Sequence, residues 1–170
     1  LSVEKTNKFP KILISRKNEG LLKKLFEIEI PEITSGIIEI KSVAREAGSR
    51  AKVAVYSAVP NIDTIGACIG QKGARIKNIV DELNGERIDI VEWKPVVEEF
   101  VSAVLSPAVV ESVTILEDGT ARVLVEPSQL SLAIGKNGQN ARLAARLTGM
   151  RVDIKVIDKD KETLKEGEDE

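Results

Sequence analysis

The sequence contains no histidine and a single cysteine, and each shortage excludes a class of chemistry. Without histidine there can be no His-based catalytic triad, no histidine general base and no histidine-containing zinc site. Cys68 has no second cysteine with which to form an intramolecular disulfide, so nothing indicates an oxidising compartment. We therefore expect a protein that is not an enzyme and that carries no metal and no cofactor.

Long apolar runs are also missing. No run approaches the roughly 18 residues that a membrane helix needs, and no signal-peptide pattern opens the sequence. We expect a cytoplasmic protein with no membrane partner. The 170 residues are enough for one medium domain or two small ones, and hydrophobic residues make up an ordinary 42% of them.

The net charge of −2 hides an uneven distribution. Residues 158–170 contain seven acids and three lysines, a net charge of −4, so residues 1–157 together carry +2. Two stretches there, 65–80 and 127–151, hold basic residues and no acid. A polyanion responds to local potential rather than to the total, so both stretches are candidate nucleic-acid surfaces. The alternative is that such short basic stretches are only solvated helix faces.

An internal repeat organises the chain. Ile69–Ile76 (IGQKGARI) aligns with Ile134–Ala141 (IGKNGQNA) at an offset of 65 residues. Asn84–Ile90 (NGERIDI) aligns with Thr148–Ile154 (TGMRVDI) at an offset of 64 residues. Two anchors at nearly the same offset indicate a duplicated domain of about 65 residues.

Both copies show the same order of periodicities: helix, strand, strand, helix, glycine turn, helix, strand. In the first copy we expect helices at 18–29 and 74–83 and strands at 37–44, 51–59 and 87–93, with a short helix that runs to Ile69 from start signals at Pro60, Asn61 and Asp63. In the second copy we expect a helix that begins at about Pro95 and is ended by Pro107, helices at 128–134 and 139–147, and strands at 108–115, 120–126 and 151–157. Ser128 is expected to cap its helix, and Asp118-Gly119 to form a hairpin turn.

Each copy places a Gly-x-x-Gly sequence between two helices: Gly70-Gln71-Lys72-Gly73 and Gly135-Lys136-Asn137-Gly138. Glycine has no Cβ, so a sugar-phosphate backbone can approach such a loop closely. The following helix offers N–H groups and the positive end of its dipole to phosphates. Two glycines three residues apart can also form a simple helical corner, but recurrence at equivalent positions favours an RNA clamp. Neither copy fits the GxGxxG or P-loop pattern of nucleotide-binding enzymes.

The sequence IGxxG between two helices resembles the signature of the KH family, whose loop clamps about four nucleotides by their backbone. Two strands precede the motif and one follows the second helix, so the resemblance implies the type II form. The fold class is then α/β (α+β): two tandem KH domains, each a three-stranded sheet with helices packed on one face. The five aromatic residues agree with this, because RRM and OB-fold binders stack bases on aromatic rings.

Longer segments resemble the KH region of the bacterial NusA family, among them LFEIEIPEITSGIIEI (25–40), GERIDIVEW (85–93) and SLAIGKNGQNARLAARLTG (131–149). The resemblance implies a transcription elongation factor that binds single-stranded RNA and regulates pausing, termination and antitermination by RNA polymerase. The family's polymerase-binding domain is not in the sequence. We therefore expect RNA polymerase to be a partner of the full-length protein rather than of these 170 residues alone.

Domain boundaries follow from the repeat and from this resemblance. They are 1–16 for the end of an upstream OB-fold domain or a linker, 17–94 for the first KH domain, 95–157 for the second and 158–170 for an acidic disordered tail. The motif match implies RNA-binding residues at Ile69, Gly70, Gln71, Lys72, Gly73, Arg75, Ile76, Ile134, Gly135, Lys136, Asn137, Gly138, Gln139, Asn140 and Arg142.

Other residues have weaker claims to a functional role. Arg45, Arg50 and Lys52 near the first hairpin are candidates to face RNA, although cations on edge strands also deter aggregation. Trp93 is expected to pack at the junction between the domains, and Cys68 to be a small core residue.

One alternative function remains open at the level of the sequence. A KH module of the translation or RNA-decay machinery would share this chemistry but not the NusA-like segments. A pull-down that recovers ribosomes rather than polymerase would favour it.

The junction between the two copies is short. Only Lys94 and its neighbours separate the strand ending near Trp93 from the helix starting at about Pro95, which is too little for a flexible tether. We expect a rigid pair whose loops form one track for roughly eight to ten nucleotides.

Overall fold

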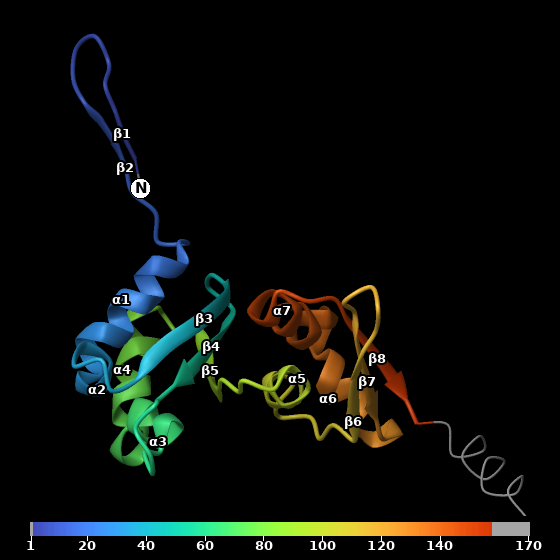
Figure 1. Ribbon diagram of the computed structural model, residues 1–170. Helices are drawn as coiled ribbons and strands as arrows, with labels where there is room; N and C mark the ends of the chain where they lie inside the picture. The colour runs from blue at the N-terminus through green and yellow to red at the C-terminus, as the bar shows by residue number, and fades with distance from the viewer. Residues whose placement is uncertain (1, 158–170) are drawn as a thin grey trace, which may run out of the picture.

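The computed structural model describes residues 2–157, which form two units of like architecture side by side (Figure 1). The expected acidic tail lies outside the described residues. The first unit consists of α1 (Glu19–Glu29), α2 (Pro31–Thr34), β3 (Glu39–Glu46), β4 (Arg50–Tyr56), α3 (Thr64–Ile69), α4 (Ala74–Glu82) and β5 (Arg87–Glu92). The second unit consists of α5 (Val97–Val104), β6 (Ser112–Ile115), β7 (Ala121–Val125), α6 (Leu130–Ile134), α7 (Gln139–Thr148) and β8 (Val152–Val156).

Each unit contains one three-stranded sheet with the same topology. The order is β3-β4-β5 in the first and β6-β7-β8 in the second. In both, the first two strands are antiparallel and the last pairs in parallel with the middle one, as Val53 pairs with Val43 and Ile90. A parallel pair needs a crossover, and α3 with α4, or α6 with α7, provides it. The predicted α/β class and the predicted element order are confirmed.

Local sequence explains where several helices begin. The Asn18 side chain accepts a hydrogen bond from the Gly20 N–H at 2.7 Å, and Asp63 accepts one from the Gly66 N–H at 2.8 Å, so both residues act as N-caps. Pro31 follows α1 and opens the short helix α2, because proline suits the first helical position.

Two details of the second unit differ from the prediction. Ser128 does not cap a helix; it lies inside a 3₁₀ turn, Pro127–Gln129, that leads directly into α6 without a side-chain cap. The first strand begins at Ser112 rather than at 108. The reason is that the Val109 N–H donates to the Gln129 side chain, 3.0 Å away, instead of to a neighbouring strand.

The first sheet is buried on both faces, because its strands alternate between two cores. Val43 and Val53 point towards α1, α3 and α4 of their own unit. Ala44 and Ala54 point the other way and belong to the core of the second unit, together with Phe100. Figure 1 shows α5 and α7 lying between the two sheets. The predicted packing of each unit's own helices on one face is therefore correct, but the opposite face of the first sheet is covered by the second unit.

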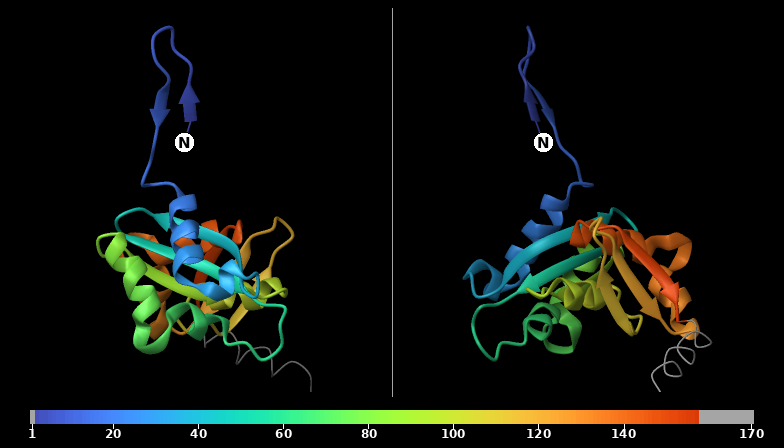
Figure 2. Two further views of the ribbon diagram at one scale, coloured as in Figure 1. Left: turned by 90° about the vertical axis from the view of Figure 1, so that its left-hand side faces the viewer. Right: turned by 45° about the vertical axis from the view of Figure 1, so that its right-hand side comes forward.

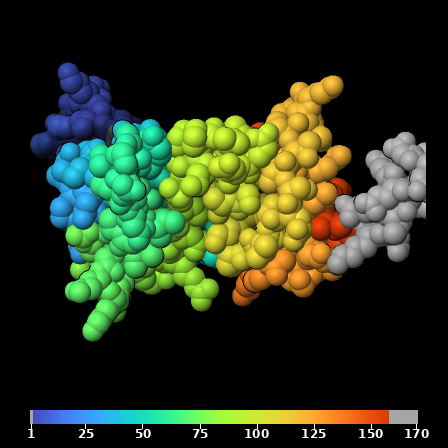
Figure 3. All heavy atoms as spheres, turned by 60° about the horizontal axis from the view of Figure 1, so that its bottom comes forward, coloured from blue at the N-terminus to red at the C-terminus, as the bar shows by residue number. Residues whose placement is uncertain are grey.

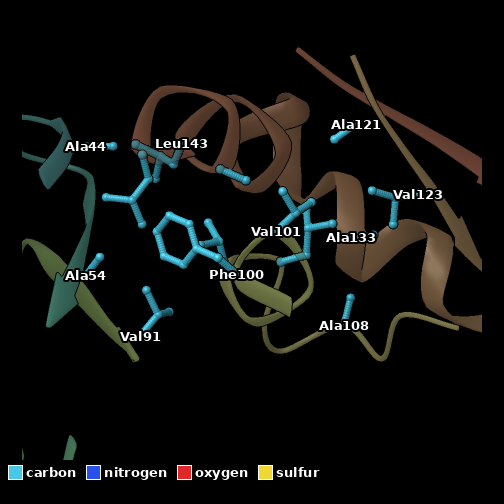
Figure 4. Close-up of a cluster of buried hydrophobic side chains, with 14 of the residues drawn as sticks. Ala44, Ala54, Val91, Phe100, Val101, Ala108, Ala121, Val123, Ala133 and Leu143 are labelled. Atoms are coloured by element: carbon cyan, nitrogen blue, oxygen red, sulfur yellow. The ribbon is translucent and has the colours of Figure 1, made fainter. Parts of the chain in front are cut away.

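The shared core is made of small residues on one side and large ones on the other. Figure 4 shows Phe100 directed from α5 towards Ala54 and Val91, with Leu143 of α7 above it. Alanine on the strands allows the helices to approach closely, and the side chains on both sides are at most 7% exposed. On the face seen in Figure 3, the two units meet without a gap.

The first residues form a hairpin that stands away from both units (Figure 2). Strand β1 (Ser2–Glu4) pairs antiparallel with β2 (Lys11–Leu13). Its apolar side chains lie in solvent; Val3 is 66%, Phe9 79% and Ile12 69% exposed. We expected one terminal strand or a linker at 1–16, and the structure has two short strands there that no core supports.

Candidate nucleic-acid interface

The two Gly-x-x-Gly loops adopt the same backbone conformation. Gly70 lies at φ 76°, ψ 173° and Gly135 at φ 74°, ψ 171°. The third loop positions, Lys72 and Asn137, are both left-handed at φ 52°, ψ 27° and φ 53°, ψ 29°. The conformation therefore repeats although the two central residues differ.

The two glycines of each loop meet different constraints. A Cβ on Gly135 would lie 2.8 Å from the Asn140 Cβ and 2.9 Å from the Asn140 backbone nitrogen. A Cβ on Gly73 would meet nothing within 4 Å. The first glycine is thus required by the packing behind the loop, whereas the last faces open space from which a ligand backbone can approach.

The central side chains of both loops are free to meet a ligand. Gln71, Lys72, Lys136 and Asn137 are exposed. Ile69 and Ile134, just before the loops, are 37% and 39% exposed, so each adds an apolar edge. Ile76 is only partly buried and packs against the first core.

The helices that follow the loops present uncapped N-termini. Gly73 and Gly138 are the N-cap residues of α4 and α7, and neither helix has a side-chain cap or an acid in its first turn. Both helices start with N–H groups and the positive end of the helix dipole beside a lysine-containing loop. This arrangement is suited to phosphate groups.

Two predicted site residues lie behind the loops rather than on them. Asn140 is 1% exposed, and its side-chain amide donates to the carbonyl oxygens of Leu105, Leu132 and Ala133. Arg75 donates to the Ala67 carbonyl at 2.7 Å and to Glu32 at 2.9 Å, within the first unit. Both side chains hold the loop against the helix before it.

Two further predicted residues contact the other unit. Gln139 and Arg142, in the first turns of α7, both donate to the carboxylate of Glu46 at the end of β3. The hydrogen bonds from Arg142 and then from Gln139 lower the pKa of Glu46 to about 2, so the carboxylate is ionised at neutral pH. No feature of the sequence pointed to Glu46, because nothing local relates it to a helix more than ninety positions away.

Arg45, Arg50 and Lys52, the weaker candidates, lie on the β3–β4 hairpin and form ion pairs within the protein. The interpretation that they face RNA is wrong for two of them, Arg45 and Lys52, because both are buried. Arg45 and Glu86 form an ion pair of 2.7 Å whose side chains are 3% and 1% exposed. Lys52 is fully buried between Asp89, at 3.1 Å, and the Ser106 carbonyl, at 3.0 Å. Burial lowers the pKa of Lys52, and the Asp89 carboxylate opposes that shift.

Arg50, the third of these candidates, keeps part of its surface in solvent. It forms a bidentate pair with Asp89, in which Nε and Nη2 donate at 2.8 and 3.0 Å. Its side chain is 22% exposed.

The predicted junction and core residues lie where expected. Trp93 contacts Tyr56 edge-on, at a ring-centre distance of 5.3 Å, and Phe100 of the second unit at 6.3 Å. Cys68 is buried in the first core, and its burial, assisted by the charge of Glu32, raises its thiol pKa to about 11.

Among residues 2–157, no group of three or more histidine, cysteine and carboxylate side chains is placed to hold a metal ion. Within the same part of the chain, no helix has the length and apolar character to cross a membrane.

Comparison with known protein families identifies the family of both units. Residues 16–93 match the model of the NusA-like first KH domain, and residues 97–162 match that of the NusA-like second KH domain. The chain belongs to the NusA KH-domain family. The NusA resemblance and the assignment of two KH domains, each with a three-stranded sheet, are thereby confirmed.

Several relatives align with this chain over most of its length. The transcription termination/antitermination protein NusA of Bacillus subtilis is 56% identical over 154 residues, which cover 90% of this chain and 42% of the relative. The protein of the same name from Thermus thermophilus is 52% identical over 148 residues, covering 86% and 38%. The chain thus spans about two fifths of the NusA proteins it matches.

One solved structure shows a related fold. The crystal structure of APE1850 superposes with a TM-score of 0.59 and 23% sequence identity, covering 78% of this chain and 94% of that one. At this identity the likeness concerns the fold alone.

Proposed function

We propose that this chain binds single-stranded RNA through its two Gly-x-x-Gly loops. The observation that carries the proposal is the repeated loop conformation, with an exposed basic centre and an uncapped helix N-terminus behind it. Phosphates of a single strand would meet the loop backbone and the lysines. Bases would lie against the apolar edge formed by Ile69 in one domain and Ile134 in the other.

The individual residues take different parts in this proposal. The RNA backbone contacts Gly70, Gln71, Lys72, Gly73 and the equivalent Gly135, Lys136, Asn137 and Gly138. The bases lie against the apolar edges formed by Ile69, Ile76 and Ile134. Arg75 and Asn140 support the loops from behind, because one is paired inside its own domain and the other is buried. Gln139 and Arg142 lie beside the second loop but are bound to Glu46.

The biological role follows from the relatives and is likewise a proposal. The matched proteins are named for transcription termination and antitermination. We infer that this chain supplies the RNA-binding part of such a factor in the cytoplasm, without catalysis of its own. Contact with RNA polymerase is assigned to the full-length protein.

The decisive experiment replaces the centres of both loops. Gln71-Lys72 and Lys136-Asn137 are changed to Asp-Asp, which lowers the net charge by six, two for each lysine and one for each neutral residue. Aspartate tolerates the left-handed backbone of Lys72 and Asn137, so the melting temperature should change by only a few degrees. Binding of a single-stranded ten-nucleotide RNA should be abolished, because the loops then repel phosphates.

A charge-matched control separates the loops from the overall field. Lys5, Lys8 and Lys17 are exposed and lie outside the two loops, and changing all three to aspartate lowers the net charge by the same six units. This variant should retain most of its RNA affinity. Equal loss in the two variants, or no loss in the loop variant, would refute the loop assignment.

A further inference from the structure

A chain of hydrogen bonds runs from the first KH domain to the loop of the second. Glu46 of β3 accepts from Arg142 through Nε at 2.5 Å and Nη2 at 3.3 Å. The third guanidinium nitrogen of Arg142, Nη1, donates to the carbonyl of Asn137 inside the second loop at 3.2 Å. One arginine thus connects a carboxylate of one domain with the loop backbone of the other.

Gln139 strengthens the same connection. As the first residue of α7, it donates through Nε2 to Glu46 at 2.9 Å and to the Ser49 hydroxyl at 2.8 Å. Both partners lie at the turn between β3 and β4. The first domain therefore contacts the second domain at the helix N-terminus that follows the loop.

The first loop is supported differently. Arg75, which packs behind Gly70, donates to Glu32 and to the Ala67 carbonyl, both in its own domain. Within residues 2–157, Arg75 beside the first loop is bound by its own domain, whereas Arg142 beside the second loop is bound by Glu46 of the neighbouring domain.

We propose that Glu46 is a positioning residue for the second Gly-x-x-Gly loop, which it sets through Arg142 and Gln139 so that one RNA strand can engage both loops. This inference rests on the proposed RNA-binding function. In it Arg142 orients the loop rather than binding phosphate, and three of its five N–H groups already donate to Glu46 and to the Asn137 carbonyl. The competing possibility is that phosphate displaces Glu46 and takes Arg142 for itself.

Neutralising the carboxylate distinguishes these two roles, because they predict changes of opposite sign. If Glu46 positions the loop, Glu46→Gln should weaken binding of a ten-nucleotide RNA by roughly threefold, the range of one partly exposed ion pair. Binding of a four-nucleotide RNA, which reaches one loop, should change less than twofold. If Arg142 is a phosphate ligand restrained by Glu46, the same substitution should tighten binding of the longer RNA, which would overturn the proposal.

A second readout reports on the loop without RNA. In the free protein, Glu46→Gln should shift the backbone amide resonances of Lys136, Asn137, Gly138 and Gln139, while those of Gln71 to Gly73 stay in place. Arg142→Gln should give the same shifts and the same loss of affinity, and the double variant should lose no more than either single one. Unchanged resonances in the second loop would refute the positioning role even if affinity falls.

Two further variants complete the design. Glu27→Gln removes a carboxylate from an exposed ion pair with Lys24 within α1, which is outside both loops in sequence, and should change neither readout. The Asp-Asp loop variant is measured alongside. If it binds RNA with wild-type affinity, the proposed RNA binding through the loops is wrong; if it loses RNA while Glu46→Gln does not weaken binding, only the positioning role is wrong.

Discussion

At the scale of single residues, the loop glycines divide into one that packing requires and one that it leaves free. The φ and ψ of Gly135 lie in a region that is essentially restricted to glycine, and a Cβ there would collide with Asn140. Gly138 has left-handed angles, and the nearest neighbour of its Cβ would be 4.0 Å away. The two positions should therefore respond differently to the same substitution.

We predict that Gly135→Ala lowers the free energy of unfolding by about 2–4 kcal/mol, from backbone strain together with the clash. Gly138→Ala should cost about 1 kcal/mol, since only the left-handed conformation is penalised. Urea denaturation of both variants measures the difference. Equal costs would show that the loop can move away from Asn140.

The buried pair of Arg45 and Glu86 makes a prediction about pH. Burial by itself raises the pKa of Glu86, but the hydrogen bonds from Arg45 and from the Gly48 N–H outweigh it and leave the pKa below its ordinary value of 4.5. Because the pKa is lower in the folded protein, this pair stabilises it above about pH 4.5 and ceases to do so as the pH falls through the depressed pKa.

Glu86→Gln should therefore destabilise the protein at pH 7, by about 3–5 kcal/mol, because it leaves the Arg45 charge buried without a counter-ion. The difference from wild type should shrink as the pH is lowered from 4.5. Thermal unfolding of both proteins across this range provides the measurement. A difference that stays constant with pH would mean that the pKa of Glu86 is not lowered in the folded state.

At the scale of elements, strand β4 serves two cores with alternate residues. Val53 faces the helices of its own domain and Ala54 faces those of the second. The sequence predicted a strand here, in a sheet with helices packed on one face. No local pattern in the run AKVAVYSAV indicated that a second domain covers the other face.

We predict that Ala54→Asp separates the two domains without unfolding the first, because the new carboxylate regains water once the domains part. Small-angle scattering should show a larger radius of gyration while circular dichroism is retained. Val53→Asp, its neighbour on the opposite face, should instead unfold the first domain. If Ala54→Asp leaves the radius of gyration unchanged, the shared core is not what holds the domains together.

At the scale of the whole molecule, the rigidity expected from the short junction has a second cause. Phe100 packs on the first sheet, and Lys52 reaches the Ser106 carbonyl of the second domain at 3.0 Å. The short junction at Lys94 and the interface between the domains therefore both restrict domain motion, and a longer linker would leave the interface in place.

Ten Gly/Ser residues inserted after Lys94 should accordingly cause a modest loss of affinity for a ten-nucleotide RNA. The insertion combined with Ala54→Asp should cause a much larger loss, up to ~10²-fold, because the effective concentration of the second loop then falls to that set by a flexible linker. Fluorescence anisotropy with ten- and four-nucleotide RNAs measures both, and the short RNA should not respond. Wild-type affinity of the combined variant for the long RNA would show that the domains bind independently.

The sequence by itself determined the features that depend on neighbouring residues. The order of elements, the hairpin turns and the two loops follow from periodicity, caps and glycines within about ten positions of one another, and the repeat reinforced each assignment. The loop centres Gln71, Lys72, Lys136 and Asn137 could be singled out for the same reason. The start of β6 differs from the prediction by a few residues, because the Val109 N–H before the strand donates to the Gln129 side chain.

Only the tertiary structure decided what the charged side chains do. Arg45 pairs with a carboxylate 41 positions away and Arg142 with one 96 positions away. No local pattern indicates such pairs, since the first forms only once the first domain has folded and the second only once the two domains have packed. The same packing buried Lys52 and covered the second face of the first sheet. The conformation of each loop thus depends on a few neighbouring residues. The position of one loop relative to the other depends on how the two domains pack together.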